Sequence, residues 1–120
     1  MATVTLGATD FESTVDTHDI VLVDFWAAWC GPCRQFAPIF EKASDEHPGI
    51  VFAKVDTEAE QGLAAAAQIT SIPTLMAFKD GTLVFSQPVA LPAAALGELI
   101  SAVQDLDIEQ ARRDAEVAGG

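Results

Sequence analysis

Cys30 and Cys33 are the residues of this chain whose type and spacing best suit chemistry. They stand three residues apart, so both sulfur atoms lie on one face if a helix starts there. At a helix start, unpaired backbone N–H groups and the helix dipole favour a thiolate. Because the thiolate is the nucleophile of thiol–disulfide exchange, we predict that Cys30 attacks a disulfide. Cys33, one turn inside the helix, would then resolve the mixed disulfide.

The same spacing is also compatible with half of a structural zinc site, which needs four ligands. The sequence contains no further cysteine, and its two histidines, His18 and His47, are not spaced as a ligand pair. We therefore favour redox chemistry over metal binding. We expect no metal ion and no cofactor beyond a redox-active disulfide between Cys30 and Cys33.

Hydrophobic periodicity predicts the elements that position the cysteine pair. The nearly continuous apolar run at 20–25 is typical of a strand buried on both faces. Asp80-Gly81 between two apolar runs predicts a hairpin, and residues 9–12 have the form of a capping box that opens a helix. The predicted strands are 3–6, 20–25, 50–55, 74–78 and 83–85, and the predicted helices are 9–18, from the cysteine pair to 47, 58–68, and 92–106.

This order of elements predicts an α/β fold with a central mixed sheet and helices on both faces. The early alternation of strands and helices implies parallel strands, and the late hairpin adds antiparallel ones. A length of 120 residues fits one domain. We assign residues 1–107 to it, and residues 108–120 to a polar tail that is a frayed helix or disordered.

The charge of the chain limits its partners. The net charge is −12, with six scattered Lys and Arg residues, so we expect no nucleic-acid partner and no anionic membrane partner. The N-terminal segment has neither a basic region nor a long apolar run, which predicts no signal peptide and a cytoplasmic location. We expect a monomer.

Three segments of the chain resemble the thioredoxin family. They are DFWAAWCGPC at 24–33, SIPT at 71–74 and FKDG at 78–81, and the similarity covers about Val4 to Leu106. Three motifs at family-like spacing are far more specific than the cysteine pair alone. The resemblance implies the thioredoxin fold and a protein-disulfide reductase. Its implied partners are client proteins with exposed disulfides and an NADPH-dependent flavoprotein thioredoxin reductase.

The resemblance also implies roles for residues near the cysteine pair. Asp24 lies in an apolar strand, where desolvation should raise its pKa, and its family counterpart is the acid/base partner of the second cysteine. Lys54 matches the lysine that balances this charge. The alternatives are a structural ion pair or an Asp solvated at a strand end. Ile72-Pro73 matches a cis-proline that faces the cysteines, and a cis bond there would leave the Ile72 backbone free to pair with an extended substrate.

Three further positions bear on partner choice and redox direction. Trp29 is expected to be exposed beside the cysteines, against the partner. Gly31 and Pro32 carry no positive charge to stabilise the thiolate further, which favours a reducing pair over an oxidising one. Val89 stands where most thioredoxins have glycine, in a loop that borders the family's substrate groove, and is expected to narrow that groove or change partner choice.

Two other functions remain open from the sequence. Thioredoxin-like domains also act as interaction or co-chaperone modules in which the cysteines are dispensable. An oxidase or isomerase would need an oxidising compartment and a less reducing cysteine pair.

Overall fold

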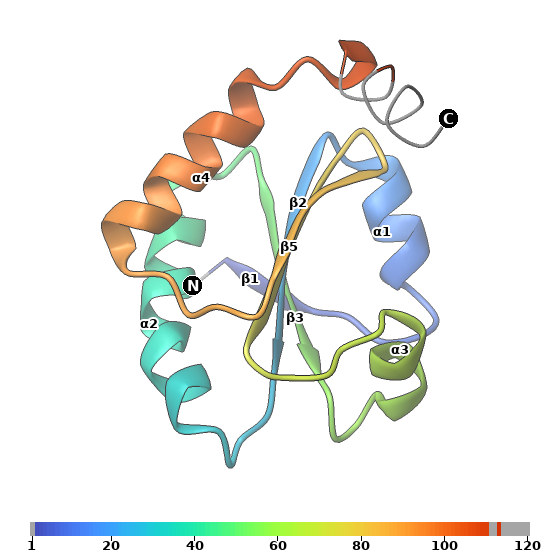
Figure 1. Cartoon of the computed structure of the whole chain (residues 1–120), viewed down its shortest axis with the longest axis vertical. Coiled ribbons are helices and arrows are strands. Elements are labelled where there is room, and N and C mark those ends of the chain that lie inside the picture. The colour runs from blue at the N-terminus through green and yellow to red at the C-terminus, as the bar shows by residue number, and fades with distance from the viewer. Residues whose placement is uncertain (1, 111–112, 114–120) are drawn as a thin grey trace.

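The structure, a computed structural model, describes residues 2–110 and residue 113. A five-stranded sheet runs through the centre, with helices on both sides (Figure 1). The elements in chain order are β1 (Thr3–Thr5), α1 (Phe11–Thr17), β2 (Ile20–Trp26), α2 (Gly31–Glu46), β3 (Val51–Asp56), α3 (Gln61–Ala66), β4 (Thr74–Lys79), β5 (Thr82–Gln87) and α4 (Ala93–Asp105).

The sheet is mixed, as predicted, with the strand order β1-β3-β2-β4-β5. β3 is parallel to both β1 and β2, whereas β4 is antiparallel to β2 and β5. Residues 20–25 of the central strand β2 are all buried, which confirms that this apolar run is covered on both faces. The end of β2 is therefore held on both sides where the chain turns toward the cysteine pair.

Each face of the sheet has its own apolar core, because side chains along a strand alternate between faces. Leu22 and Phe52 lie on the face covered by α2 and α4, together with Phe36, Phe40 and Ile100. The opposite face is covered by α1 and α3 (Figure 1), and its core contains Val21, Val23, Phe25, Val15 and Val55.

Two helices begin later than predicted. The capping box at 9–12 does not form: α1 begins at Phe11, and the Asp10 Oδ1 atom accepts a hydrogen bond from the Gly7 backbone N–H at 2.7 Å instead of capping the helix. α3 is shorter than 58–68, because Asp56 Oδ1 accepts the Glu58 N–H at 2.9 Å and holds a turn ahead of the helix.

The hairpin between β4 and β5 forms as predicted. Asp80 and Gly81 both have positive φ, 51° and 76°, which matches the turn that joins two tightly paired antiparallel strands. At the end of β4, the Lys79 Nζ atom donates hydrogen bonds to the carbonyls of Val103, Gln104 and Leu106, at 2.9, 2.7 and 2.7 Å. Lys79 thus ties the C-terminal end of α4 to the sheet.

Of the predicted tail, residues 108–110 and 113 are described. Residues 108–110 are helical, and Ile108 is buried. The Asp107 Oδ1 atom accepts the backbone N–H groups of Glu109 and Gln110, at 3.0 and 3.1 Å. The expectation for residues 111–112 and 114–120 lies outside the described residues.

Candidate active site

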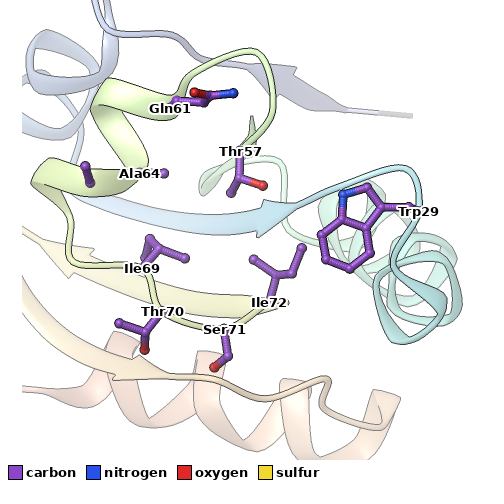
Figure 2. Close-up of a pocket in the computed structure, with 9 residues that line it drawn as sticks. Trp29, Thr57, Gln61, Ala64, Ile69, Thr70, Ser71 and Ile72 are labelled. Carbon is purple, nitrogen blue, oxygen red and sulfur yellow. The ribbon is translucent and has the colours of Figure 1, made fainter.

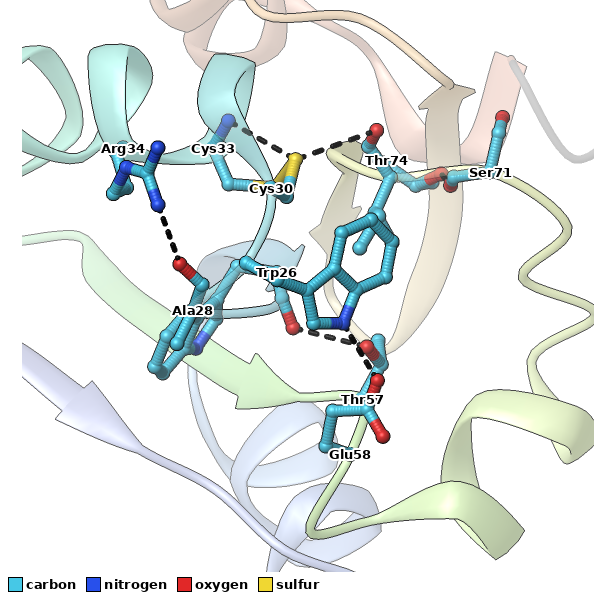
Figure 3. Close-up of a disulfide and its surroundings, with 11 residues drawn as sticks. Trp26, Ala28, Cys30, Cys33, Arg34, Thr57, Glu58, Ser71 and Thr74 are labelled. Carbon is cyan, nitrogen blue, oxygen red and sulfur yellow. Dashed lines mark hydrogen bonds between the residues drawn. A yellow bond between two sulfur atoms is a disulfide. The ribbon is translucent and has the colours of Figure 1, made fainter.

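The cysteine pair lies at the start of α2, as the spacing predicts. Cys30 is the N-cap residue of α2, and its Sγ atom accepts a hydrogen bond from the Cys33 backbone N–H at 3.2 Å (Figure 3). The two residues form a disulfide. Their exposed fractions are 4% for Cys30 and 2% for Cys33, so both residues are buried in the disulfide form.

The loop from β2 to α2 holds the disulfide in place. Ala27 is fully buried and accepts the Cys30 backbone N–H at 3.2 Å. The Arg34 guanidinium reaches back from α2 and donates to the Ala28 carbonyl at 2.9 Å (Figure 3). Gly31 and Pro32 form the first turn of the helix, where proline needs no hydrogen-bond partner for its nitrogen.

Asp24 is fully buried on the central strand. Leu22, two residues earlier on β2, packs in the core under α2, so by strand alternation the Asp24 side chain lies on that same face. Neither carboxylate oxygen has a hydrogen-bond partner among the described residues. Burial raises the pKa of the Asp24 carboxyl from its ordinary 3.8 to about 7, and the positive charge of Lys54 offsets part of that rise.

Lys54 lies beside Asp24 on the neighbouring strand. The two residues are register partners in the parallel pair of β2 and β3. The Lys54 Nζ atom lies over the Trp26 indole, 5.0 Å from the ring centroid. Trp26 in turn packs against the buried cluster of Ala27, Cys30 and Cys33.

The Ile72–Pro73 peptide bond is cis, as the resemblance implies. The Ile72 carbonyl oxygen lies 3.8 Å from the Cys30 Sγ atom, and the Ile72 side chain packs on the cysteine cluster. The Thr74 hydroxyl donates to the Ser71 carbonyl at 2.6 Å and closes the turn around the proline. The Ile72 backbone, 42 residues along the chain from Cys30, thus borders the Cys30 sulfur.

Trp29 is 67% exposed, as expected, and forms one end of a cavity of about 580 Å³ beside the cysteines. Its indole N–H donates to the Glu58 carboxylate at 2.7 Å. Figure 2 shows side chains from α3 and from the segment before β4 around this cavity. Its lining residues are Trp29, Thr57, Gln61, Ala64, Ala65, Ile69, Thr70, Ser71 and Ile72.

Comparison with known proteins decides the family. The family model described as Thioredoxin matches residues 2–102. This chain belongs to the thioredoxin family. A candidate thioredoxin 2 of Streptomyces coelicolor is 50% identical, over 93% of this chain and 84% of that protein. The thioredoxin of Haemophilus influenzae is 42% identical over 77% of this chain and 88% of its own length.

Solved thioredoxin structures share the fold. A Plasmodium falciparum thioredoxin aligns with a TM-score of 0.75 and 34% identity, covering 82% of this chain and 96% of that one. A mutant thioredoxin of Halobacterium salinarum aligns with a TM-score of 0.78 and 33% identity, over 88% and 92%. With the Cys30–Cys33 pair at disulfide distance, membership of this family makes the protein a thiol–disulfide oxidoreductase. Its partners are a thioredoxin reductase and disulfide-containing clients.

Val89 lies apart from the cavity beside Trp29. It is half-buried in the loop between β5 and α4, and its N–H donates to the Gln87 carbonyl at 3.0 Å. Val89 is not among the residues that line that cavity. Its expected effect on the thioredoxin groove stays a prediction.

Two contacts of the site were not predicted from the sequence. Glu58, the acceptor for Trp29, is 29 residues away along the chain, and the stacking of Lys54 on Trp26 joins two strands. Neither pair forms a local motif, so only the register of the strands and the path of the loop could reveal them.

The described residues contain no group of three or more His, Cys, Asp or Glu side chains that could hold a metal ion. Within the same residues, no helix is long and apolar enough to cross a membrane.

Proposed function

We propose that this protein reduces exposed disulfides of client proteins, with Cys30 as the attacking thiolate. The observation that supports this most directly is the position of Cys30 at the N-cap of α2, where its sulfur accepts the Cys33 N–H. That hydrogen bond and the helix dipole both stabilise negative charge on the sulfur. The reduced protein attacks one client sulfur, forms a mixed disulfide with Cys30 and releases the other client sulfur as a thiolate, which takes up a proton.

Cys33 completes the reaction in a second exchange. Its thiol gives its proton to the Asp24 carboxylate, and the resulting thiolate attacks the Cys30 sulfur. The Cys30–Cys33 disulfide forms, and the second client sulfur leaves as a thiolate. The burial of Asp24 supports this role, because its raised pKa of about 7 suits a group that exchanges protons near neutral pH. Lys54 balances the charge of the ionised carboxylate.

The client segment would bind beside the Cys30 sulfur. The Ile72 backbone next to cis Pro73 offers hydrogen bonds to an extended strand, and the exposed Trp29 ring offers an apolar surface beside it. Val89 would border the far side of the groove that holds the client segment, and would narrow that groove.

The direction of electron flow follows from the residues between the cysteines. Gly31 and Pro32 add no positive charge, so the reduced form gains no further stabilisation and the pair stays reducing. Electrons would come from NADPH through a flavoprotein thioredoxin reductase. We place this activity in the cytoplasm, in a monomer whose domain spans residues 1–107, with 108–120 as an appended tail and no metal or cofactor beyond the disulfide.

Reduction of insulin by dithiothreitol tests the roles of the cysteines. We expect Cys30→Ser to abolish the catalysed rate and Cys33→Ser to accumulate mixed disulfides with clients. Both variants remove one sulfur atom and break the same disulfide, so each controls for the structural cost in the other. Full activity in Cys30→Ser would refute its assignment as nucleophile, and the absence of trapped adducts in Cys33→Ser would refute the resolving role.

A redox titration against glutathione tests the direction. The reduction potential of thioredoxins is about −270 mV, and that of a strong dithiol oxidant is about −120 mV. We expect the Cys30–Cys33 couple to lie near the first value. A potential near the second would make the protein an oxidant and overturn the reductase proposal.

A further inference from the structure

Three residues of β2 and β3 lie on one face of the sheet. Asp24 and Trp26 are two residues apart on β2, so their side chains lie on the same face. Lys54 on β3 is the register partner of Asp24. This face is the one covered by α2. Leu22 and Phe52, which are register partners two residues before Asp24 and Lys54 on their strands, both pack in the core beneath that helix.

The Lys54 side chain has a long flexible stem, and half-buried lysines usually extend their charged end toward water. Here the ammonium group stays beside the strand, 5.0 Å from the centroid of the Trp26 ring. The face of an indole attracts a cation more strongly than any other aromatic ring does. The indole Nε1 atom is buried and has no hydrogen-bond partner among the described residues. Packing, rather than a hydrogen bond of its own, therefore holds the ring that Lys54 contacts.

The charges around Asp24 come from few elements. On β3 they are Lys54, its register partner, and Asp56, the register partner of Trp26. Asp56 Oδ1 already accepts the backbone N–H of Glu58 at 2.9 Å, which directs that carboxylate toward the loop before α3. On β4 the register partner of Asp24 is Leu75, which carries no charge, and Cys33 at the start of α2 is part of the disulfide and does not titrate in this form.

We propose that Trp26 is a positioning residue, whose indole face holds the Lys54 ammonium close to the buried Asp24 carboxylate. Without the ring, the Lys54 stem would extend into solvent and its charge would be screened from Asp24. Trp26 would then control how readily Asp24 ionises. It would act through Lys54, and its own polar atom would not bond to the reacting sulfur atoms. The importance of this control for turnover rests on the proposed function, in which Asp24 accepts the Cys33 proton.

Titration of Asp24 in a set of variants tests the inference. The variants are Trp26→Leu, Trp26→Phe and Lys54→Met, together with the two double variants that combine each Trp26 change with Lys54→Met. The carboxyl ¹³C chemical shift of Asp24 is followed against pH in the disulfide form. This readout needs no substrate and no turnover.

We expect Lys54→Met to raise the pKa of Asp24 by about one, because the positive charge of Lys54 lowers that pKa and a nearby opposite charge typically lowers an acid's pKa by about one or more. Trp26→Leu should produce about half of that rise, and Trp26→Phe a smaller one, because a benzene ring keeps a weaker cation-binding face. In the Lys54→Met background both Trp26 changes should leave the Asp24 pKa where Lys54→Met alone puts it. If Trp26→Leu does not fold, Trp26→Phe decides by the same comparison.

The inference is overturned if the Trp26 variants leave the Asp24 pKa unchanged, or if they raise it equally with and without Lys54. The second result would mean that the ring acts by excluding water rather than through the lysine. The pH dependence of client reduction separates this test from that of the proposed function. If the Asp24 pKa moves as expected but the rate profile does not follow it, the proposed role of Asp24 fails while the role of Trp26 stands.

Discussion

Replacement of Asp24 by asparagine should stabilise the protein in a pH-dependent way. Asp24 is fully buried, and its carboxylate oxygens have no hydrogen-bond partner among the described residues. Burial raises its pKa to about 7, whereas in the unfolded chain it ionises with the ordinary value of 3.8. Asparagine has a similar shape and never ionises, so the variant removes the cost of holding this charge inside the protein.

The sign follows from proton binding. Between about pH 4 and pH 7 the unfolded chain has lost the Asp24 proton and the folded protein still holds it, so raising the pH favours unfolding. A difference of about three in pKa corresponds to about 4 kcal/mol of unfolding free energy, present below the unfolded pKa and lost as pH rises through 7. The Asp24→Asn variant avoids this loss. Its stability relative to the parent protein should therefore increase by about 4 kcal/mol from about pH 4 to about pH 8.

Denaturant unfolding of the disulfide form at a series of pH values measures this difference. Groups that titrate equally in both proteins cancel, and any constant cost of the buried amide shifts the difference by the same amount at every pH. Asp105→Asn, at an exposed position near the end of α4, is the matched control and should show no trend. A stability difference between Asp24→Asn and the parent that stays flat across this range would refute the argument that buried Asp24 titrates near neutral pH.

Three further outcomes are expected. Lys79→Met removes three hydrogen bonds to the carbonyls at the end of α4 and should lower the unfolding free energy by about 1–3 kcal/mol, measured in urea. Gly81→Ala places a side chain at φ +76° and should cost about 1 kcal/mol in the same assay. Glu58→Ala removes the acceptor of the Trp29 indole N–H, and should shift that N–H resonance and speed its exchange with solvent.

Each of these has a matched control. Lys42→Met changes an exposed lysine on α2, and a cost equal to that of Lys79→Met would show that the three bonds contribute nothing. Gly49→Ala introduces a methyl group into open space, and should leave stability nearly unchanged; a loss as large as in Gly81→Ala would contradict the backbone argument. Glu58→Gln keeps an acceptor oxygen, so it should largely preserve the Trp29 resonance that Glu58→Ala moves.

Patterns that depend on neighbouring residues predicted the structure well. The continuous apolar run of β2 and the Asp80-Gly81 turn both form where expected, because burial on two faces and positive φ each need particular residue types. Two helix starts were predicted less well. Asp10 and Asp56 each use a carboxylate oxygen to bind a loop N–H, and the sequence does not show which of several nearby N–H groups such a side chain binds.

By itself, the sequence determined where the cysteine pair lies relative to a helix, since Cys30 and Cys33 need only the turn between β2 and α2 to share one face. The tertiary structure alone decided what surrounds the pair. The stacking of Lys54 on Trp26 and the bond from Trp29 to Glu58 depend on strand register and loop path. Those features arise from packing across the whole sheet, because residues far apart in the chain become neighbours only when both apolar faces are buried at once.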